Sequence, residues 1–156
     1  MKLLLIRHAT ADDRSLGFPD RSRQLTDKGR QQCLRLAAFL AGAELGAGLL
    51  LCSTLCRSLQ TAEILHRQLG WPAPQQVNWL DIYSQAAVQQ QAIAHYAGQG
   101  TELLVCVGHE PDLSALLASY LQTEASCFRI KKASASLLQL DGSQASLLWS
   151  LPVALM

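Results

Sequence analysis

The chain has 156 residues, of which 49% are hydrophobic and 16% charged, and its formal net charge is +1. A compact fold of this length hides roughly 70% of the surface that its unfolded chain would expose, which excludes a disordered or peptide-like protein. Thirteen Lys and Arg against twelve Asp and Glu leave no overall field to gather nucleic acid or an anionic membrane. Any anion site must therefore be local.

The amino terminus and the cysteines indicate a chain that stays in the cytoplasm. Residues 3–6 form an apolar run that is too short for the core of a signal peptide. No stretch approaches the roughly eighteen apolar residues of a membrane span. The five cysteines form an odd set without a CxxC pair. We expect reduced thiols, a cytoplasmic location and no contact with a membrane.

Short apolar runs alternate with amphipathic segments along most of the chain, which predicts an α/β layer fold. Residues 2–7 form a strand that is apolar enough to be covered on both faces. After a polar loop, a helix opens with Thr26 as its cap and ends at the breaker over residues 42–48. Residues 49–52 form a second buried strand.

The middle of the chain continues the same alternation. The expected elements are a helix capped by Ser53 and ending near Leu69, a short strand at 77–82, a helix at 85–97, a strand at 103–107 and a helix at 111–121.

The last third is rich in β-forming residues. Residues 133–140 and 143–151 flank Asp141-Gly142, a typical pair for a tight hairpin turn. The sequence therefore predicts one α/β domain over residues 1–156, a three-layer α/β/α sandwich. Its central sheet should be mostly parallel, with an antiparallel hairpin at the C-terminal end.

Polar side chains follow the carboxyl ends of three predicted parallel strands. Arg7 and His8 follow the first, Ser53 and, one helical turn later, Arg57 follow the second, and His109 follows the third. Ligands of open α/β sheets bind at this edge. We therefore expect two guanidinium groups and two imidazoles in one crevice.

Such a crevice suits a phosphoryl group. The arginine fork pairs with phosphate oxygens, and a neutral imidazole is a nucleophile that needs no separate base. Helices that begin after Ser53 and after Gly108 would add amide donors, which makes both residues candidate substrate-binding positions.

Four blocks of sequence carry a resemblance to a known family. They read LIRHA at 5–9, RQLTDKG at 23–29, STLCRSLQTA at 53–62 and VGH at 107–109. In this order they resemble the histidine phosphatase superfamily. The short length and GHEPDL at 108–113 resemble its short bacterial branch, the SixA-type phosphohistidine phosphatases. The resemblance covers about residues 2–113 and implies a phosphoglycerate mutase-like fold.

The resemblance also implies roles for single residues. His8 would attack phosphorus to give a phosphohistidine intermediate, while Arg7, Arg57 and His109 would hold the transferring oxygens. Positioning of this kind needs no metal and no other cofactor. The implied activity is the hydrolysis of phosphohistidine on a protein partner, which would place the chain in phosphorelay signalling. Ala9 stands where the family commonly has glycine.

The resemblance further implies a proton donor for the leaving group, because many larger members of the family supply a carboxylate from the segment after the second helix. Asp81 is the nearest candidate by position, with Asp12, Asp13 and Glu110 as rivals. A weak or absent acid would favour phosphohistidine. Its ring leaves as neutral imidazole once protonated, whereas an alkyl phosphate leaves as a strongly basic alkoxide.

Two other functions stay open, namely a small-molecule phosphomonoesterase of the same fold and a phosphate-binding module without turnover. A metal site would use His8, His109, Glu110 and Asp112, but their spacing is not that of metal ligands, and two arginines would repel the cation.

The rim of the crevice is less clearly marked. Lys131 and Lys132 are expected to be a solvated strand end or a basic rim for an acidic protein partner. Residues 70–101 are filled by one short strand and one helix, which leaves no lid. An open site suits a residue presented on the surface of another protein.

Overall fold

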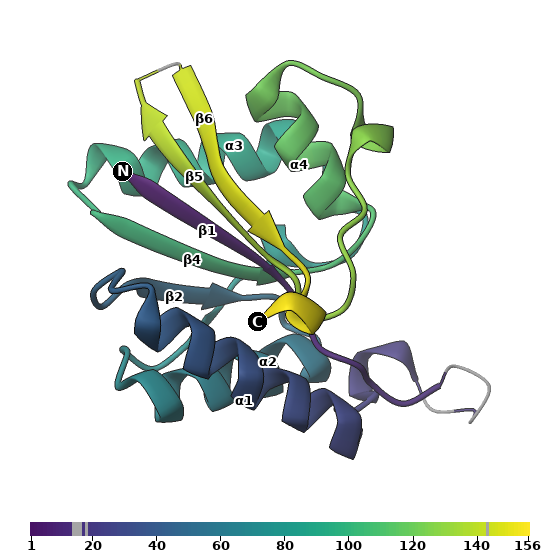
Figure 1. Cartoon of the computed structure of the whole chain (residues 1–156). Coiled ribbons are helices and arrows are strands. Elements are labelled where there is room, and N and C mark those ends of the chain that lie inside the picture. Colours follow the sequence, from purple (N-terminus) through teal and green to yellow (C-terminus); the bar gives the residue numbers. More distant parts are fainter. Residues whose placement is uncertain (14–16, 18, 143) are drawn as a thin grey trace.

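A six-stranded sheet forms the centre of the computed structural model, which describes residues 1–13, 17, 19–142 and 144–156 (Figure 1). The strands are β1 (Lys2–Arg7), β2 (Leu49–Cys52), β3 (Gln75–Gln76), β4 (Leu103–Gly108), β5 (Ala135–Asp141) and β6 (Gln144–Leu151). They lie in the order β3-β2-β4-β1-β5-β6. The first four strands are mutually parallel, and β5 runs antiparallel to β1 and β6. The predicted mixed sheet is confirmed.

Helices cover both faces of this sheet (Figure 1). They are α1 (Asp27–Gly42), α2 (Cys56–Leu69), α3 (Ala86–Gly98) and α4 (Asp112–Leu121). Side chains alternate along β1, because successive residues of a strand point to opposite faces. Leu4 and Ile6 pack in the core under α1 and α2, and Leu3 and Leu5 pack in the core under α3 and α4. The three-layer arrangement is thereby confirmed.

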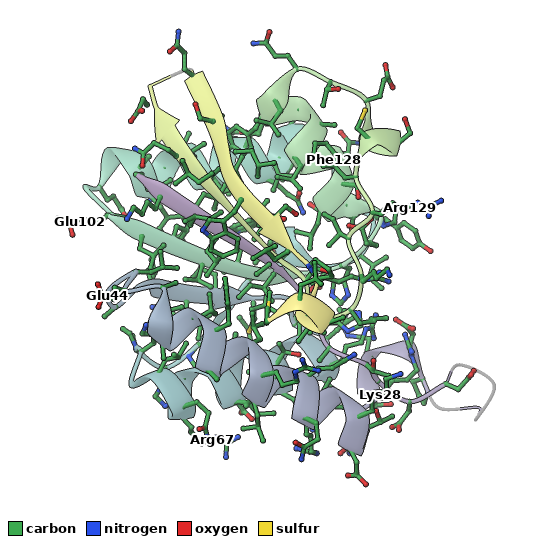
Figure 2. All side chains as sticks on the ribbon, in the orientation of Figure 1. Lys28, Glu44, Arg67, Glu102, Phe128 and Arg129 are labelled. Carbon is green, nitrogen blue, oxygen red and sulfur yellow. The ribbon has the colours of Figure 1, made fainter. Side chains whose placement is uncertain are left out.

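Charged side chains lie on the outside of these layers. Lys28, Glu44, Arg67 and Glu102 are exposed and point away from the ribbon (Figure 2). Among the described residues, no helix has the length and apolarity to cross a membrane.

Two elements in the middle of the chain differ from the sequence-based expectation. Helix α2 begins at Cys56 with Leu55 as its cap, so Ser53 is not the helix cap. Residues 77–82 are not a strand, because pairing with β2 is confined to Gln75–Gln76 and the chain then turns into a short 3-10 helix, η3 (Asn78–Leu80). Short apolar runs fit a strand and a helical turn equally well.

The hairpin of β5 and β6 forms around Asp141 and Gly142, as expected. Gly142 has a φ of 61°, which a tight turn of this kind requires. Ser143, the expected start of the second arm, lies outside the described residues. The first arm begins at Ala135 rather than at Ala133, because Ala133 has a left-handed φ of 55°.

The first turn of α1 packs tightly against the segment that follows the first strand. Thr26 caps the helix by accepting from the Gly29 N–H at 3.1 Å, as predicted. A Cβ atom at Gly29 would lie 2.0 Å from the carbonyl oxygen of Thr10. We expect Gly29→Ala to lower the free energy of unfolding by about 1–3 kcal/mol. The midpoint of thermal unfolding should fall by roughly 2–4 °C per kcal/mol.

Gly42, at the other end of α1, provides the matched control. It is exposed, and a Cβ there meets nothing within 4 Å. Gly42→Ala should therefore leave stability unchanged or raise it by up to about 1 kcal/mol, because alanine favours a helix over glycine. Equal losses in the two variants would contradict the assigned close contact at Gly29.

Candidate active site

The register of the two central strands places two histidines side by side. Arg7 at the end of β1 lies opposite Gly108 at the end of β4, so the next residues, His8 and His109, leave the sheet together. Their ring centroids are 4.9 Å apart, and the backbone N–H of His8 donates to the Gly108 carbonyl at 3.1 Å. Only 3% of His8 and 2% of His109 is exposed. The expected pairing of the imidazoles at the carboxyl edge is present.

The tautomer of His8 follows from one hydrogen bond. Its Nδ1 lies 2.7 Å from the carbonyl oxygen of Ala9. A carbonyl only accepts, so Nδ1 carries the proton and Nε2 of the neutral ring carries the free lone pair. The Nε–H of Arg57 donates to this Nε2 at 3.2 Å. The free lone pair of His8 therefore lies on Nε2, beside Arg57.

Arg57 is held at the bottom of the crevice. It lies in the first turn of α2 and is 1% exposed. Thr61, one turn further on, donates to the Arg57 carbonyl and accepts from the backbone N–H of Ala9. This contact fixes the start of α2 against the residue that follows the nucleophile. The serine, arginine and threonine of the second strand–helix block thus lie close to His8.

Asp20, which sequence reasoning missed, completes the surroundings of Arg57. Arg57 Nη1 donates to the Asp20 carbonyl at 2.7 Å, and Nη2 forms an ion pair with Asp20 Oδ2 at 3.0 Å. Arg23 binds the other carboxylate oxygen of Asp20. Burial alone would raise the pKa of Asp20, but the hydrogen bonds from Arg23 and Arg57 outweigh it and lower that pKa. Asp20 therefore covers the guanidinium of Arg57.

Two buried donors or acceptors of the site have no hydrogen-bond partner within the part of the chain that the structure describes. They are Arg7 Nε and His109 Nδ1. Arg7 uses Nη1 to donate to the carbonyl of Ile130 at 2.6 Å. An unpaired buried polar atom costs about 1–3 kcal/mol, so native structures keep one where a ligand supplies the partner. Both atoms belong to residues that the resemblance implies as phosphate ligands.

His109 is supported by a chain of hydrogen bonds that ends on a carboxylate. Ser53 Oγ donates to Asp81 Oδ1 at 2.8 Å. The same hydroxyl lies 2.8 Å from His109 Nε2, so it accepts from the Nε2–H of the ring. Ser53 is fully buried and also accepts from the Leu55 N–H. These contacts favour a role for Ser53 in orienting His109 over the expected direct contact with substrate.

The structure argues against Asp81 as the proton donor. Its carboxylate accepts hydrogen bonds from Ser53, from the Thr54 N–H and from the Thr54 hydroxyl. Burial alone would raise the pKa of Asp81, but hydrogen bonds from Thr54 and Ser53 outweigh it and lower that pKa. An ionised carboxylate has no proton to give. We assign Asp81 to the positioning of Ser53 and His109.

Of the rival acids, Glu110 has a raised pKa, because its burial outweighs the hydrogen bonds from Ser114. Its carboxylate accepts from the N–H and the hydroxyl of Ser114, in the first turns of α4. Asp12 accepts from the Gln24 N–H, in the loop before α1, and Asp13 is exposed.

The two neighbouring lysines point in different directions. Lys131 is exposed, as expected of a strand end. Lys132 is half-buried, and its Nζ lies 3.4 Å from His8 Nε2. The expectation of a solvated side chain is therefore wrong for Lys132, because the turn that follows it is bound to the backbone of the nucleophile.

Burial lowers the pKa of both histidines. The next cause is the charge of Lys132 for His8, and the charge of Arg57 for His109, whose pKa falls to about 3. Both rings are neutral in the folded protein at neutral pH. This state keeps the lone pair of His8 available for attack.

These pKa shifts predict a loss of stability in acid. The unfolded chain takes up protons on both histidines near pH 6.5, and the folded chain does not, so stability is complete above about pH 6.5 and decreases below it. Between pH 6.5 and 5.5, the free energy of unfolding should fall with a slope that approaches about 1.4 kcal/mol per pH unit for each histidine. Urea titrations at several pH values measure this slope for the protein and for His8→Asn. The slope of the variant should be smaller by the contribution of one histidine. Identical slopes would contradict the shift at His8.

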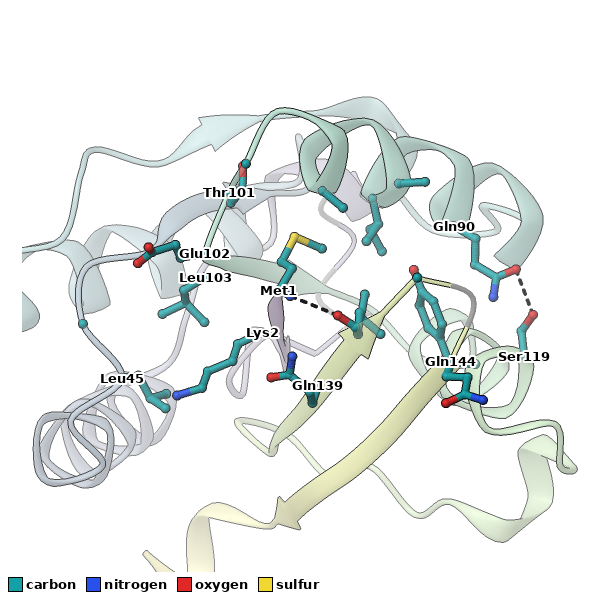
Figure 3. A pocket seen from close by; sticks show the side chains of 18 of the residues that line it. Met1, Lys2, Leu45, Gln90, Thr101, Glu102, Leu103, Ser119, Gln139 and Gln144 are labelled. Carbon is teal, nitrogen blue, oxygen red and sulfur yellow. Dashed lines mark hydrogen bonds between the residues drawn. The ribbon is translucent and has the colours of Figure 1, made fainter.

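A cavity of about 990 Å³ lies at the opposite end of the sheet. Met1, Lys2 and Leu103 at the start of β1 and β4 line it, together with Gln90 and Tyr120 of α3 and α4 (Figure 3). It contains none of the residues that the sequence singled out, so the chemistry of the chain is concentrated at the carboxyl edge.

Comparisons with known proteins identify the family of this chain. Residues 3–83 match the family model "Histidine phosphatase superfamily (branch 1)". An uncharacterised protein of Picosynechococcus sp. is 34% identical over 113 residues, which are 72% of this chain and 68% of that protein.

Solved structures share the fold. The structure of the protein histidine phosphatase SixA complexed with tungstate superposes with a TM-score of 0.90 at 20% identity, over 99% of this chain and 98% of that one. The alpha-ribazole phosphatase of Shigella flexneri superposes with a TM-score of 0.77 at 19% identity, over 98% of this chain and 97% of that one. At these identities the likeness establishes the fold.

Proposed function

Because this chain belongs to the histidine phosphatase superfamily, we propose that it hydrolyses phosphohistidine on a protein partner through a covalent phosphohistidine at His8. The observation that carries this proposal is the state of His8 Nε2. The bond from Nδ1 to Ala9 holds its lone pair free, and Arg57 and Lys132 lie beside it.

In the first step, the lone pair of His8 Nε2 attacks phosphorus. The Nε2–P bond forms, the N–P bond of the substrate breaks, and its electron pair goes to the substrate ring, which has taken one proton from solvent and leaves as neutral imidazole. The Nδ1–H of His8 stays bonded to the Ala9 carbonyl and shares the positive charge of the phosphorylated ring. Arg7 and Arg57 stabilise the charge on the phosphoryl oxygens, and His109 joins them when the negative charge of the bound phosphoryl group brings a proton to its Nδ1.

In the second step, a water oxygen attacks phosphorus from the side that the leaving group has vacated. The P–O bond forms, the Nε2–P bond breaks, and its electron pair returns to Nε2. One water proton passes to solvent, and inorganic phosphate leaves. The chain is then restored to its starting state, and no step in this sequence requires a metal ion or another cofactor.

Two features support phosphohistidine as the substrate class. The carboxylate that was expected to protonate a leaving group, Asp81, is held as a hydrogen-bond acceptor by Ser53 and Thr54. A protonated imidazole leaves without a strong acid, whereas an alkoxide does not. The imidazoles are also almost fully buried, so a phosphoryl group carried at the tip of a long side chain suits the site better than a bulky small molecule. All five cysteines are free, which favours the cytoplasm.

A substrate panel tests this proposal. The values of kcat/KM are compared for a phosphohistidine protein, a phosphohistidine peptide, and small sugar and nucleoside phosphates. We expect the phosphohistidine protein to be the best substrate. A clear preference for one small phosphate would instead establish the alternative, a small-molecule phosphomonoesterase. That alternative is favoured by the fold shared with the alpha-ribazole phosphatase.

The role of Asp81 gives a separate prediction. If Asp81 orients His109 through Ser53, Asp81→Asn should lower kcat/KM by about 10- to 100-fold for aryl and alkyl phosphates alike. A proton donor would give a loss that grows with the pKa of the leaving group. Asp141→Asn, in the exposed hairpin turn, is the matched control and should stay within about twofold of the parent. A much larger loss on the alkyl phosphate would restore Asp81 as the acid.

A further inference from the structure

Residues 130–134 pass directly beside the nucleophile. The Ala133 N–H bonds to the carbonyls of Arg7 at 3.1 Å and His8 at 3.3 Å, and the Arg7 N–H donates to the Ser134 carbonyl at 3.1 Å. Arg7 Nη1 also donates to the Ile130 carbonyl. The backbone that carries Lys132 is therefore bound at several points to the backbone that carries His8.

A turn at Ala133 directly follows the two lysines. Ala133 is fully buried, and its φ of 55° lies in the left-handed region that residues other than glycine rarely adopt. Conformations of this kind persist where the surroundings hold them, and they are common at functional sites. Here the turn leaves Lys131 exposed and brings Lys132 Nζ to within 3.4 Å of His8 Nε2.

We propose that Lys132 is a catalytic residue that binds an oxygen of the transferring phosphoryl group together with Arg7 and Arg57. The inference rests on the proposed function, and it deepens that function by adding a cation which the family blocks do not contain. In the substrate-free state the ammonium faces the lone pair of Nε2. Once phosphorus is bonded to Nε2, the oxygens on phosphorus occupy the space next to the ammonium.

The position of Lys132 decides which part of the reaction it serves. In an in-line displacement, the leaving group departs from the side of phosphorus opposite to the attacking atom. A group that touches His8 Nε2 is therefore far from the leaving atom and close to the oxygens between the two. Lys132 is placed to neutralise charge on these oxygens and is not placed to protonate the leaving group.

Lys132 also keeps the nucleophile uncharged before substrate arrives. After burial itself, the charge of Lys132 is the largest cause of the lowered pKa of His8. A compact ammonium acts as a point charge, whereas the planar fork of Arg57 also fixes geometry. The two cations next to Nε2 thus have different roles. Lys132→Arg should keep most of the effect that the charge at position 132 has on the pKa of His8.

The test compares Lys132→Met, Lys132→Arg and the neighbouring control Lys131→Met in the full chain. Two quantities are measured for each, kcat/KM with a phosphohistidine peptide and the dissociation constant of tungstate, an analogue of phosphate. Lys132→Met should lose about 10- to 100-fold in both. Lys132→Arg should stay within about tenfold of the parent, and Lys131→Met within about twofold.

The outcomes separate this inference from the proposed function. If Lys132→Met stays within about twofold of the parent in both quantities, or if Lys131→Met loses as much, the role of Lys132 is overturned. A parent protein that turns over no substrate counts against the proposed function, while tungstate binding still decides whether Lys132 is an anion ligand. Thermal unfolding of the three variants shows whether a loss comes from misfolding, and Lys132→Arg then carries the test.

Discussion

His8→Ala should reduce kcat by at least about 10⁴-fold on every substrate that the protein hydrolyses, because removing a nucleophile removes the covalent route. The neighbouring imidazole, His109, is held at Nε2 by Ser53, so it is not oriented as His8 is, with Nε2 facing Arg57 and Lys132. Activity is measured by phosphate release, with thermal unfolding as a check on the fold.

His95 provides the matched histidine control. It is exposed on α3, remote from the carboxyl edge, and His95→Ala should leave kcat within about twofold of the parent. If His8→Ala kept more than about a tenth of the activity, His8 could not be the nucleophile.

Arg57→Ala should lower kcat/KM by about 10²–10³-fold, because it removes a preorganised donor beside the reacting atom. The same change leaves the Asp20 carboxylate without the ion pair at 3.0 Å. We therefore also expect a lower stability, since a partly buried carboxylate loses a partner. Steady-state kinetics and thermal unfolding measure the two effects separately.

Arg67 is the control for Arg57, because it belongs to the same helix but is exposed and pairs with Glu63. Arg67→Ala should change kcat/KM by less than about twofold, as is usual for a surface ion pair. A loss below tenfold in Arg57→Ala, or an equal loss in Arg67→Ala, would contradict the role given to Arg57.

The sequence predicted the layers and the central pair of histidines because the relevant signals are local. Apolar runs such as Leu3 to Ile6 mark strands covered on both faces, and the carboxyl ends of parallel strands meet at one edge. The position of His8 and His109 then follows from strand order alone. The hairpin at Asp141 and Gly142 could also be predicted, because an Asp-Gly pair between two β-rich runs is a strong signal for a tight turn.

The contacts of Asp20 and Lys132 could not be predicted in the same way. Asp20 lies in a loop without periodicity and reaches Arg57 across 37 positions of sequence. Lys132 reaches His8 across 124 positions, through a turn at Ala133 that has no glycine to mark it. Loop conformation and long-range packing decide such contacts. Asp81 is a further residue whose contacts could not be predicted from the sequence. Its position in the chain suggested a proton donor, whereas its carboxylate accepts hydrogen bonds from Ser53 and Thr54.

The most direct measurement of the central claim is a rapid-quench experiment with a labelled phosphohistidine peptide. The parent protein should acquire an acid-labile phosphoryl group within one turnover, and peptide mapping should place it on His8. His8→Ala should acquire none, and Arg57→Ala should acquire it more slowly. Turnover of the peptide by the parent protein without any such label, or with a label on another residue, would contradict the account.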